Sequence, residues 1–134
     1  MQDSIFTKII KGELPCHKIY EDNKTIAFLT IQPYIEGHTL VVPKLQIDDF
    51  EQLPTEDYQA LFTTVQKVAK RIKDVFNVPK TAVTVLGMEI PHAHVHIMPV
   101  DSEASYFEAI ENRATIPNEP DHQQLALIAE RLRF

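Results

Sequence analysis

Residues 55–76 carry the longest regular pattern in the sequence and constrain the fold more than any other segment. Glu56 and Asp57 lie at its start, where a helix dipole favours negative charge, and Asn77 and Pro79 follow its end. We therefore predict one long amphipathic helix. The apolar positions that repeat at helical spacing are Tyr58, Leu61, Phe62, Val65, Val68, Ala69, Ile72, Val75 and Phe76.

Short segments rich in strand-forming residues lie on both sides of this helix. Turn-prone residues 22–24 join the first two as a hairpin, and Pro43 ends the third because proline has no N–H to donate. A tight loop at Gly87 joins the last two. In chain order the predicted strands are 18–21, 25–31, 38–42, 82–86 and 93–100.

Shorter helices are predicted near the two ends of the chain. Apolar residues at helical spacing fill residues 5–10, Ser4 or Asp3 caps their start, and Gly12 stops them. Residues 125–132 form a closing helix, whereas 101–121 show no clear pattern. This order of elements predicts a mixed sheet with helices packed on it, and hence an α+β fold.

Composition limits the classes of function. A chain of 134 residues with 44% hydrophobic residues fits a single domain over residues 1–134 with its own core. A net charge of −6 argues against nucleic acid as a partner, although a few local donors can still hold one phosphate. With no membrane-length apolar run, no basic leader and a lone Cys16, we expect a soluble, cytoplasmic protein without a membrane partner.

Three of the six histidines alternate at positions 92, 94 and 96. Because side chains alternate across a strand, their rings are expected on one face and the apolar residues between them on the other. Three neighbouring imidazoles cannot all carry charge without repulsion, so most are expected to be neutral at pH 7. Neutral rings offer lone pairs for attack or for ligation.

Three interpretations of this run stay open. It could be a solvated polar face, or a zinc site in which His38 supplies a further ligand. Rings that point in parallel from one strand converge poorly on a single ion. In the third, His94 attacks phosphorus while His92 and His96, roughly 6.5 Å away along the strand, orient the phosphate.

The run His92-Ala93-His94-Val95-His96-Ile97-Met98-Pro99 resembles the mark of the histidine triad (HIT) family, in its Hint-like branch. That resemblance implies a HIT-like fold, a mostly antiparallel sheet of about five strands with a long helix and a short N-terminal helix. It also implies a homodimer. The core of the HIT domain would span about residues 4–100, and residues 101–134 would form a divergent C-terminal segment. Further segments that match the family in order are 4–15, 20–22, 27–29 and 37–44.

The resemblance implies an activity. His94 would attack the α-phosphorus of a nucleoside phosphoramidate or nucleotide ester, and water would release the mononucleotide from the nucleotidyl-histidine. His38, His92 and His96 would hold the phosphate and position the nucleophile. The substrate would be a small nucleotide, and no cofactor is expected.

The resemblance also marks a nucleotide site, with departures. Phe28, Ile31 and Leu40 match positions that line the nucleoside pocket, although ordinary core packing is the alternative for them. Thr30 replaces an acidic residue that grips the ribose, and Met88 and Glu89 replace glutamine and serine. The positions expected to bind nucleotide are Phe28, Thr30, Ile31, Leu40, Gly87, Glu89 and Ile90.

Many relatives hold a structural zinc through two cysteines, a further histidine and a triad histidine. Here Ser4, Thr7 and Gln46 stand at the first three of those places, so no metal site is expected. Three functions are carried forward: a nucleotidyl hydrolase or phosphoramidase acting through His94, a nucleotide sensor with little turnover, and a metal-dependent hydrolase.

Overall fold

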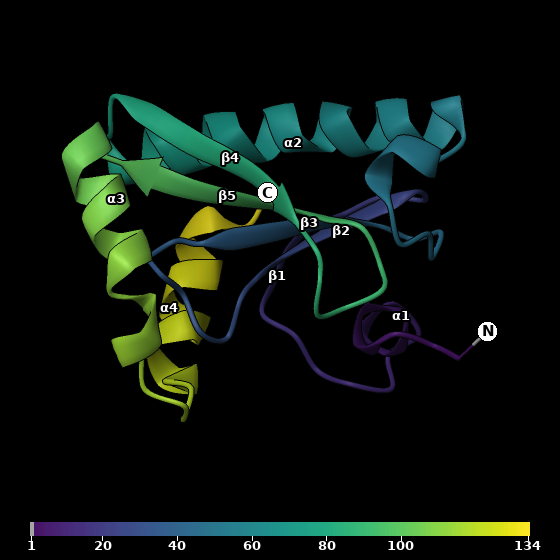
Figure 1. Cartoon of the computed structure of the whole chain (residues 1–134), viewed down its shortest axis with the longest axis horizontal. Helices are drawn as coiled ribbons and strands as arrows, with labels where there is room; N and C mark the ends of the chain where they lie inside the picture. The colour runs from purple at the N-terminus through teal and green to yellow at the C-terminus, as the bar shows by residue number, and fades with distance from the viewer. Residues whose placement is uncertain (1) are drawn as a thin grey trace.

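The computed structural model describes residues 2–134 (Figure 1). One five-stranded sheet has the order β1-β2-β3-β5-β4, and all neighbouring strands are antiparallel. With its helices it confirms the predicted α+β fold, but the sheet is wholly antiparallel and not mixed as the order of elements suggested. The elements are α1 (Ile5–Ile10), β1 (Lys18–Glu21), β2 (Thr25–Leu29), β3 (Thr39–Pro43), η1 (Phe50–Gln52), α2 (Thr55–Phe76), β4 (Lys80–Leu86), β5 (His94–Val100), α3 (Glu103–Glu111), η2 (Arg113–Thr115) and α4 (His122–Leu132).

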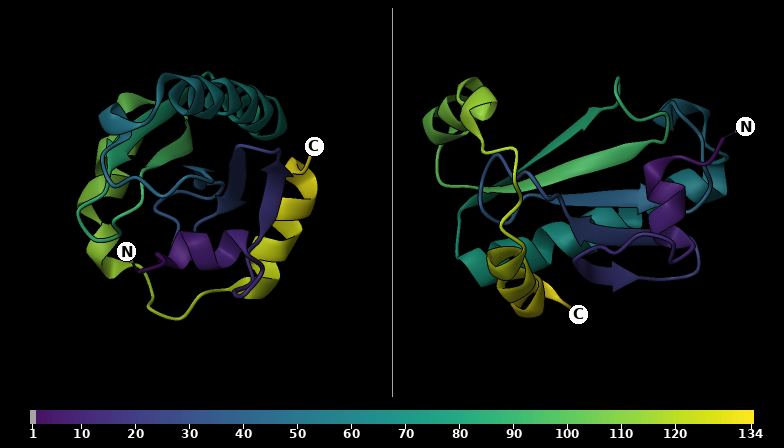
Figure 2. Two further views of the ribbon diagram at one scale, coloured as in Figure 1. Left: turned by 90° about the vertical axis from the view of Figure 1, so that its right-hand side faces the viewer. Right: turned by 90° about the horizontal axis from the view of Figure 1, so that it is seen from below.

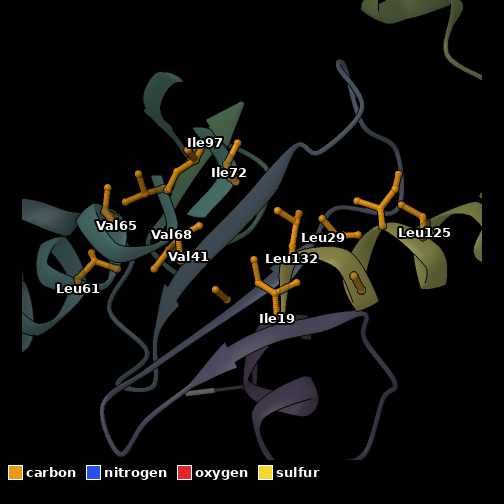
Figure 3. Packing of buried hydrophobic residues seen from close by; sticks show 14 of the residues in the cluster. Ile19, Leu29, Val41, Leu61, Val65, Val68, Ile72, Ile97, Leu125 and Leu132 are labelled. Atoms are coloured by element: carbon orange, nitrogen blue, oxygen red, sulfur yellow. The ribbon is translucent and has the colours of Figure 1, made fainter. Parts of the chain in front are cut away.

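The helices α2 and α4 cover one face of the sheet, and Figure 2 shows the sheet lying between α2 and α1. The predicted long helix is confirmed over Thr55–Phe76, and its apolar stripe supplies the middle of the main core. No helix within residues 2–134 is both long and apolar enough to cross a membrane. The core residues labelled in Figure 3 are Ile19, Leu29, Val41, Leu61, Val65, Val68, Ile72, Ile97, Leu125 and Leu132.

The opposite face carries a smaller apolar cluster and the histidines. Phe6 of α1 packs there against Phe28 and Leu40. Leu40 pairs with Phe28 on one side and with His96 on the other, so all three side chains share this face. The short helix α1 covers only part of this face, so the remainder can accommodate a reactive site.

Two stretches differ from the sequence prediction. The connection between β4 and β5 runs over residues 87–93 and is not a tight turn. Residues 101–121, for which no element was predicted, contain α3 and η2. The helix α3 has no fully buried residue, and a capping box between Ser102 and Ser105 starts it.

Candidate functional site

His38, His94 and His96 come together on the face that α1 covers. His38 immediately precedes β3, and the other two lie on β5. His38 is 2% exposed and His94 is 6% exposed. Gly37 has φ of 95°, and a Cβ there would lie 2.8 Å from the ring of Phe76. Glycine is therefore needed at the turn that leads the chain into His38.

A chain of hydrogen bonds sets the tautomers of His38 and His96. The backbone N–H of Tyr34 donates to His38 Nδ1 over 3.2 Å, so the proton of the neutral His38 ring is on Nε2. That Nε2–H donates to His96 Nδ1 over 2.8 Å. The remaining proton of His96 is therefore on Nε2, the nitrogen that has no partner among the described residues.

His94 has the complementary arrangement. Its Nδ1–H donates to the backbone carbonyl of His92 over 2.8 Å, which leaves a lone pair on Nε2. Within residues 2–134 every side-chain nitrogen or oxygen sealed from solvent has a hydrogen-bond partner. The unpaired Nε2 of His94 must therefore reach solvent. The ring centroids of His94 and His96 lie 5.1 Å apart, so the ring that carries the lone pair neighbours the ring that carries the unpaired N–H.

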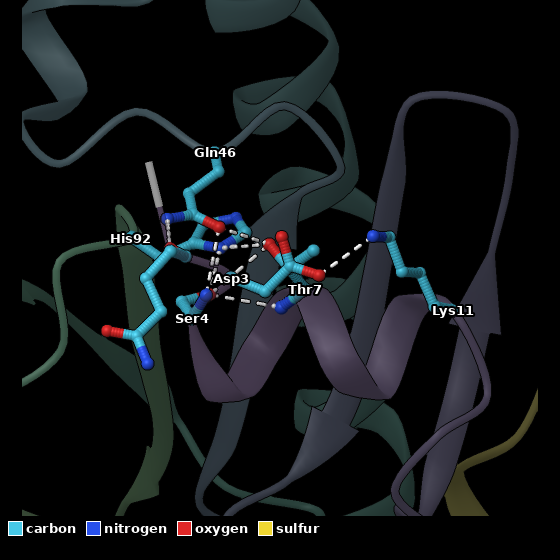
Figure 4. A network of polar contacts seen from close by, with 7 residues as sticks. Asp3, Ser4, Thr7, Lys11, Gln46 and His92 are labelled. Carbon is cyan, nitrogen blue, oxygen red and sulfur yellow. Dashed lines mark hydrogen bonds and ion pairs between the residues drawn. The ribbon is translucent and has the colours of Figure 1, made fainter.

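His92 differs from the other two triad members. It lies just before β5, its ring is 0% exposed, and its Nε2–H donates to the carbonyl of Pro43 over 2.7 Å. Its Nδ1 accepts from the hydroxyl of Ser4, also over 2.7 Å (Figure 4). The edge of the Phe6 ring packs against His92. Both nitrogens of His92 are thus occupied, and the ring cannot contact a phosphate directly.

Burial keeps these rings neutral. Together with smaller contributions from the neighbouring imidazoles, it lowers the pKa of His38 to about 3 and that of His96 to about 4. Burial also lowers the pKa of His92 and of His94, while their backbone hydrogen bonds oppose that effect. The neutral imidazoles inferred from the sequence agree with this result.

The residues expected to bind nucleotide have different surroundings. Phe28 and Leu40 are buried in the cluster beneath α1. Thr30 is half-buried and donates its N–H to the carbonyl of His38, and Ile31 is 50% exposed. A Cβ at Gly87 would lie 3.9 Å from His94 Cε1, so this glycine adjoins the reacting ring.

The loop after Gly87 is open to solvent. Met88 is 99% exposed and Glu89 is exposed, whereas Ile90 is half-buried. A surface hollow of about 380 Å³ lies between this loop and the N-terminal segment, lined by Ile5, Glu89, Ile90 and their neighbours. Glu89 therefore lies within reach of solvent next to the candidate site.

Ser4, Thr7, Gln46 and His92 form a polar cluster at the place where the resemblance implied that relatives bind zinc. This cluster does not fit that metal. Structural zinc takes thiolate, imidazole or carboxylate ligands, whereas Ser4, Thr7 and Gln46 offer two hydroxyls and an amide. These groups and His92 Nδ1 are hydrogen-bonded to one another. Across residues 2–134 no group of three or more His, Cys, Asp or Glu side chains is arranged to hold a metal ion.

Several contributors were missed by the sequence analysis. The N–H of Tyr34 and the carbonyl of Pro43 set histidine tautomers, but backbone groups leave no mark in a sequence. The hydroxyls of Thr84 and Tyr106 lie 3.2 Å apart, and Thr84 pairs across the strands with His96. Tyr106 belongs to α3, the helix without a sequence pattern.

The comparisons agree with this geometry. Residues 11–103 match the HIT domain family. An uncharacterised HIT-like protein of Methanocaldococcus jannaschii is 37% identical over 115 residues, which cover 81% of this chain and 89% of that protein. The adenosine 5'-monophosphoramidase of Saccharomyces cerevisiae is 36% identical over 102 residues, or 75% of this chain and 65% of that protein.

A solved structure supports the same assignment. The crystal structure of a Hit-like protein from Bartonella henselae superposes with a TM-score of 0.82 at 29% identity. The superposition covers 98% of this chain and 95% of that one. With its alternating histidines and five-stranded antiparallel sheet, this chain belongs to the HIT domain family, in its Hint-like branch.

Proposed function

We propose that this protein hydrolyses nucleoside phosphoramidates or nucleotide phosphoesters or anhydrides through a covalent nucleotidyl-histidine on His94. The observation that carries the proposal is the tautomer of His94. Its Nδ1 proton is held by the His92 carbonyl, so the lone pair of Nε2 is directed to the accessible side of the ring. A neutral imidazole with a fixed lone pair is a competent nucleophile at phosphorus.

The reaction would proceed in two displacements. His94 Nε2 forms a bond to the α-phosphorus as the phosphorus–nitrogen or phosphorus–oxygen bond breaks, and the leaving group departs with a proton taken from solvent. Water then attacks the phosphorus and gives up a proton to solvent, the nitrogen–phosphorus bond breaks, and the lone pair returns to His94. His96 Nε2–H lies beside the reacting ring and would donate to a phosphate oxygen as negative charge develops there.

A nucleotide substrate is supported by the relatives and by the expected pocket. The yeast relative is an adenosine 5'-monophosphoramidase. Phe28 and Leu40 give the site an apolar wall, and the half-buried Thr30 follows the strand of Phe28 and joins the backbone of His38. Thr30 has only a hydroxyl with which to bind the ribose. We therefore propose that this protein binds the ribose more weakly than a carboxylate at this position would.

We also propose a cytoplasmic homodimer. The outer strand β4 exposes apolar side chains, with Val83 47% and Leu86 56% exposed. Apolar side chains at a sheet edge support association with another chain. The single free cysteine, Cys16, is compatible with a reducing compartment.

The test is hydrolysis of adenosine 5'-phosphoramidate by the wild type and by His94→Ala. We expect the variant to release adenosine monophosphate at least about 1,000-fold more slowly, because no other group can take over the nucleophile's part. An alkaline quench during turnover, followed by intact-protein mass spectrometry, should show a nucleotidyl adduct in the wild type only. His122→Ala, which alters an exposed histidine on α4, is the matched control.

Equal rates in wild type and His94→Ala would overturn the mechanism. Tight binding of adenosine monophosphate by a wild type that forms no product over hours would favour the nucleotide sensor instead. Activity lost on chelation would favour the metal-dependent hydrolase.

A further inference from the structure

We propose that Ser4 is a positioning residue: its hydroxyl, oriented by Thr7 and Gln46, holds the His92 ring and, through the His92 carbonyl, the reacting nitrogen of His94. This inference rests on the proposed function for its catalytic consequence. Its structural part, the fixed state of His92, can be measured without any turnover. The cluster thus orients the site by hydrogen bonds where a metal would need ligands that this chain lacks.

The protons in the cluster can be assigned one by one. Gln46 Oε1 accepts from the Ser4 N–H over 2.9 Å and from the Thr7 hydroxyl over 2.6 Å, so the Thr7 proton is committed to Gln46. Gln46 is itself oriented, because its Nε2 donates to the carbonyl of Gln2 over 3.0 Å. The amide oxygen therefore faces the Ser4 N–H and the Thr7 hydroxyl (Figure 4).

The hydroxyl proton of Ser4 then has one favoured acceptor, His92 Nδ1. Its oxygen accepts from the Thr7 N–H over 3.0 Å, which also caps α1. The Ser4 proton can reach His92 Nδ1 over 2.7 Å or Thr7 Oγ1 over 3.3 Å, and the shorter contact is the stronger one. Since His92 Nε2–H donates to Pro43, Nδ1 is an acceptor and completes the pair.

This arrangement fixes His92 at both ends of its ring. Ser4 holds one nitrogen from α1, and Pro43 holds the other from the end of β3. The carbonyl of the same residue accepts from His94 Nδ1 over 2.8 Å. Rotation about residue 92 would therefore misalign the bond that sets the lone pair of His94.

The backbone around residue 92 has other supports, which limits the size of the effect. The N–H of His92 donates to the Ile90 carbonyl over 2.8 Å, and the N–H of Ala93 donates to the Ile47 carbonyl over 2.7 Å. Loss of the Ser4 contact should therefore loosen the orientation of residue 92 and leave the chain path intact. We expect a moderate loss of turnover, since small misplacements of a reacting group cost up to about 100-fold.

The decisive variant is Ser4→Asp, which separates the two parts of the Ser4 hydroxyl. An aspartate at this position can still cap α1 by accepting from Thr7, but it cannot donate to His92 Nδ1. The His92 ring must then carry a proton on Nδ1. Imidazole nitrogen chemical shifts, followed by NMR against pH, should show His92 as the Nε2–H form in the wild type and with a protonated Nδ1 in Ser4→Asp.

Kinetics provide the second readout. We expect Ser4→Asp to lower kcat about tenfold with KM within about twofold, because the substrate contacts are unchanged. Ser4→Thr restores a hydroxyl that can cap and donate, so it should return the Nε2–H form of His92 and most of kcat. Lys11→Ala removes the exposed ion pair between the two residues that flank α1, Asp3 and Lys11, and serves as the matched control, with wild-type shifts and rates.

If Ser4→Asp does not fold, Ser4→Gly takes its place, because glycine is accepted at a helix start and also lacks the donor. The proposal is overturned if His92 Nδ1 is protonated in the wild type, if Ser4→Asp leaves the His92 shifts unchanged, or if purified wild type holds one zinc per chain. A wild type with the assigned tautomer but no turnover would instead reject the proposed function and retain the structural assignment.

Discussion

The two ends of the histidine run use the same side chain in opposite ways. At the closed end, His92 is 0% exposed and both its ring nitrogens are hydrogen-bonded. At the reacting end, His94 and His96 each have one ring nitrogen bonded and the other without a partner in residues 2–134. The comparison teaches that the partner of the second nitrogen, and not the residue type, decides whether a triad histidine can react or only position.

The largest effect expected from this comparison is a split between His96→Ala and His92→Ala. Removal of the half-buried His96 ring should lower kcat about 100-fold or more, as loss of a transition-state donor does. Its cost in stability should be smaller than that of His92→Ala, because only the Nε2–H of His38 loses its partner. Removal of the His92 ring leaves a cavity and unpairs Ser4 and Pro43. It should lower the free energy of unfolding by about 2–4 kcal/mol.

Urea denaturation and steady-state kinetics on both variants measure this split. His122→Ala serves again as the control for loss of an exposed imidazole. If His96→Ala destabilised the protein as much as His92→Ala did, the two ends would not differ in the way the hydrogen bonds indicate.

The next effect is a loss of stability in mild acid, to which the buried rings of His38 and His96 contribute. Histidine has an ordinary pKa of 6.5, and folding lowers that of His38 to about 3 and that of His96 to about 4. Below pH 6.5 the unfolded chain binds more protons than the folded protein does, so the free energy of unfolding falls as pH falls. Between pH 7 and pH 5 each of these groups should cost about 2 kcal/mol.

Denaturation curves collected from pH 7 to pH 5 check this expectation. His38→Gln removes one of the rings whose pKa is lowered and should reduce the decline by about 2 kcal/mol. A free energy of unfolding that stayed constant over this range in the wild type would show that the rings are far more accessible to protons than their burial indicates.

Much of the fold could be inferred from the sequence because its elements carry strong local patterns. The long helix has an apolar stripe that must be buried, and the strands are separated by turn residues and Pro43. By contrast, α3 has no buried residue and gave no periodic pattern. The length of the loop before β5 was also missed, because nothing local marks where a strand starts to pair.

The site was identified from the sequence only in its residue types. The alternation of His92, His94 and His96 indicated neutral imidazoles on one face, and the pKa shifts agree. The sequence could not show that His92 is sealed beneath α1, because its partners Ser4 and Pro43 lie far away along the chain. Tautomers depend on such long-range contacts and on backbone groups, which no local pattern encodes.

The smallest expected effect is that of Tyr106→Phe, which tests whether α3 belongs to the reacting end. Tyr106 of α3 shares a hydrogen bond with Thr84, whose cross-strand partner is His96. Tyr106→Phe removes that bond and keeps the ring, so it should cost about 1 kcal/mol of stability and leave kcat within about twofold. Thermal denaturation and the phosphoramidate assay measure both quantities. A tenfold fall in kcat at unchanged stability would extend the reacting end through Thr84 to α3, and would give the C-terminal segment a direct part in turnover.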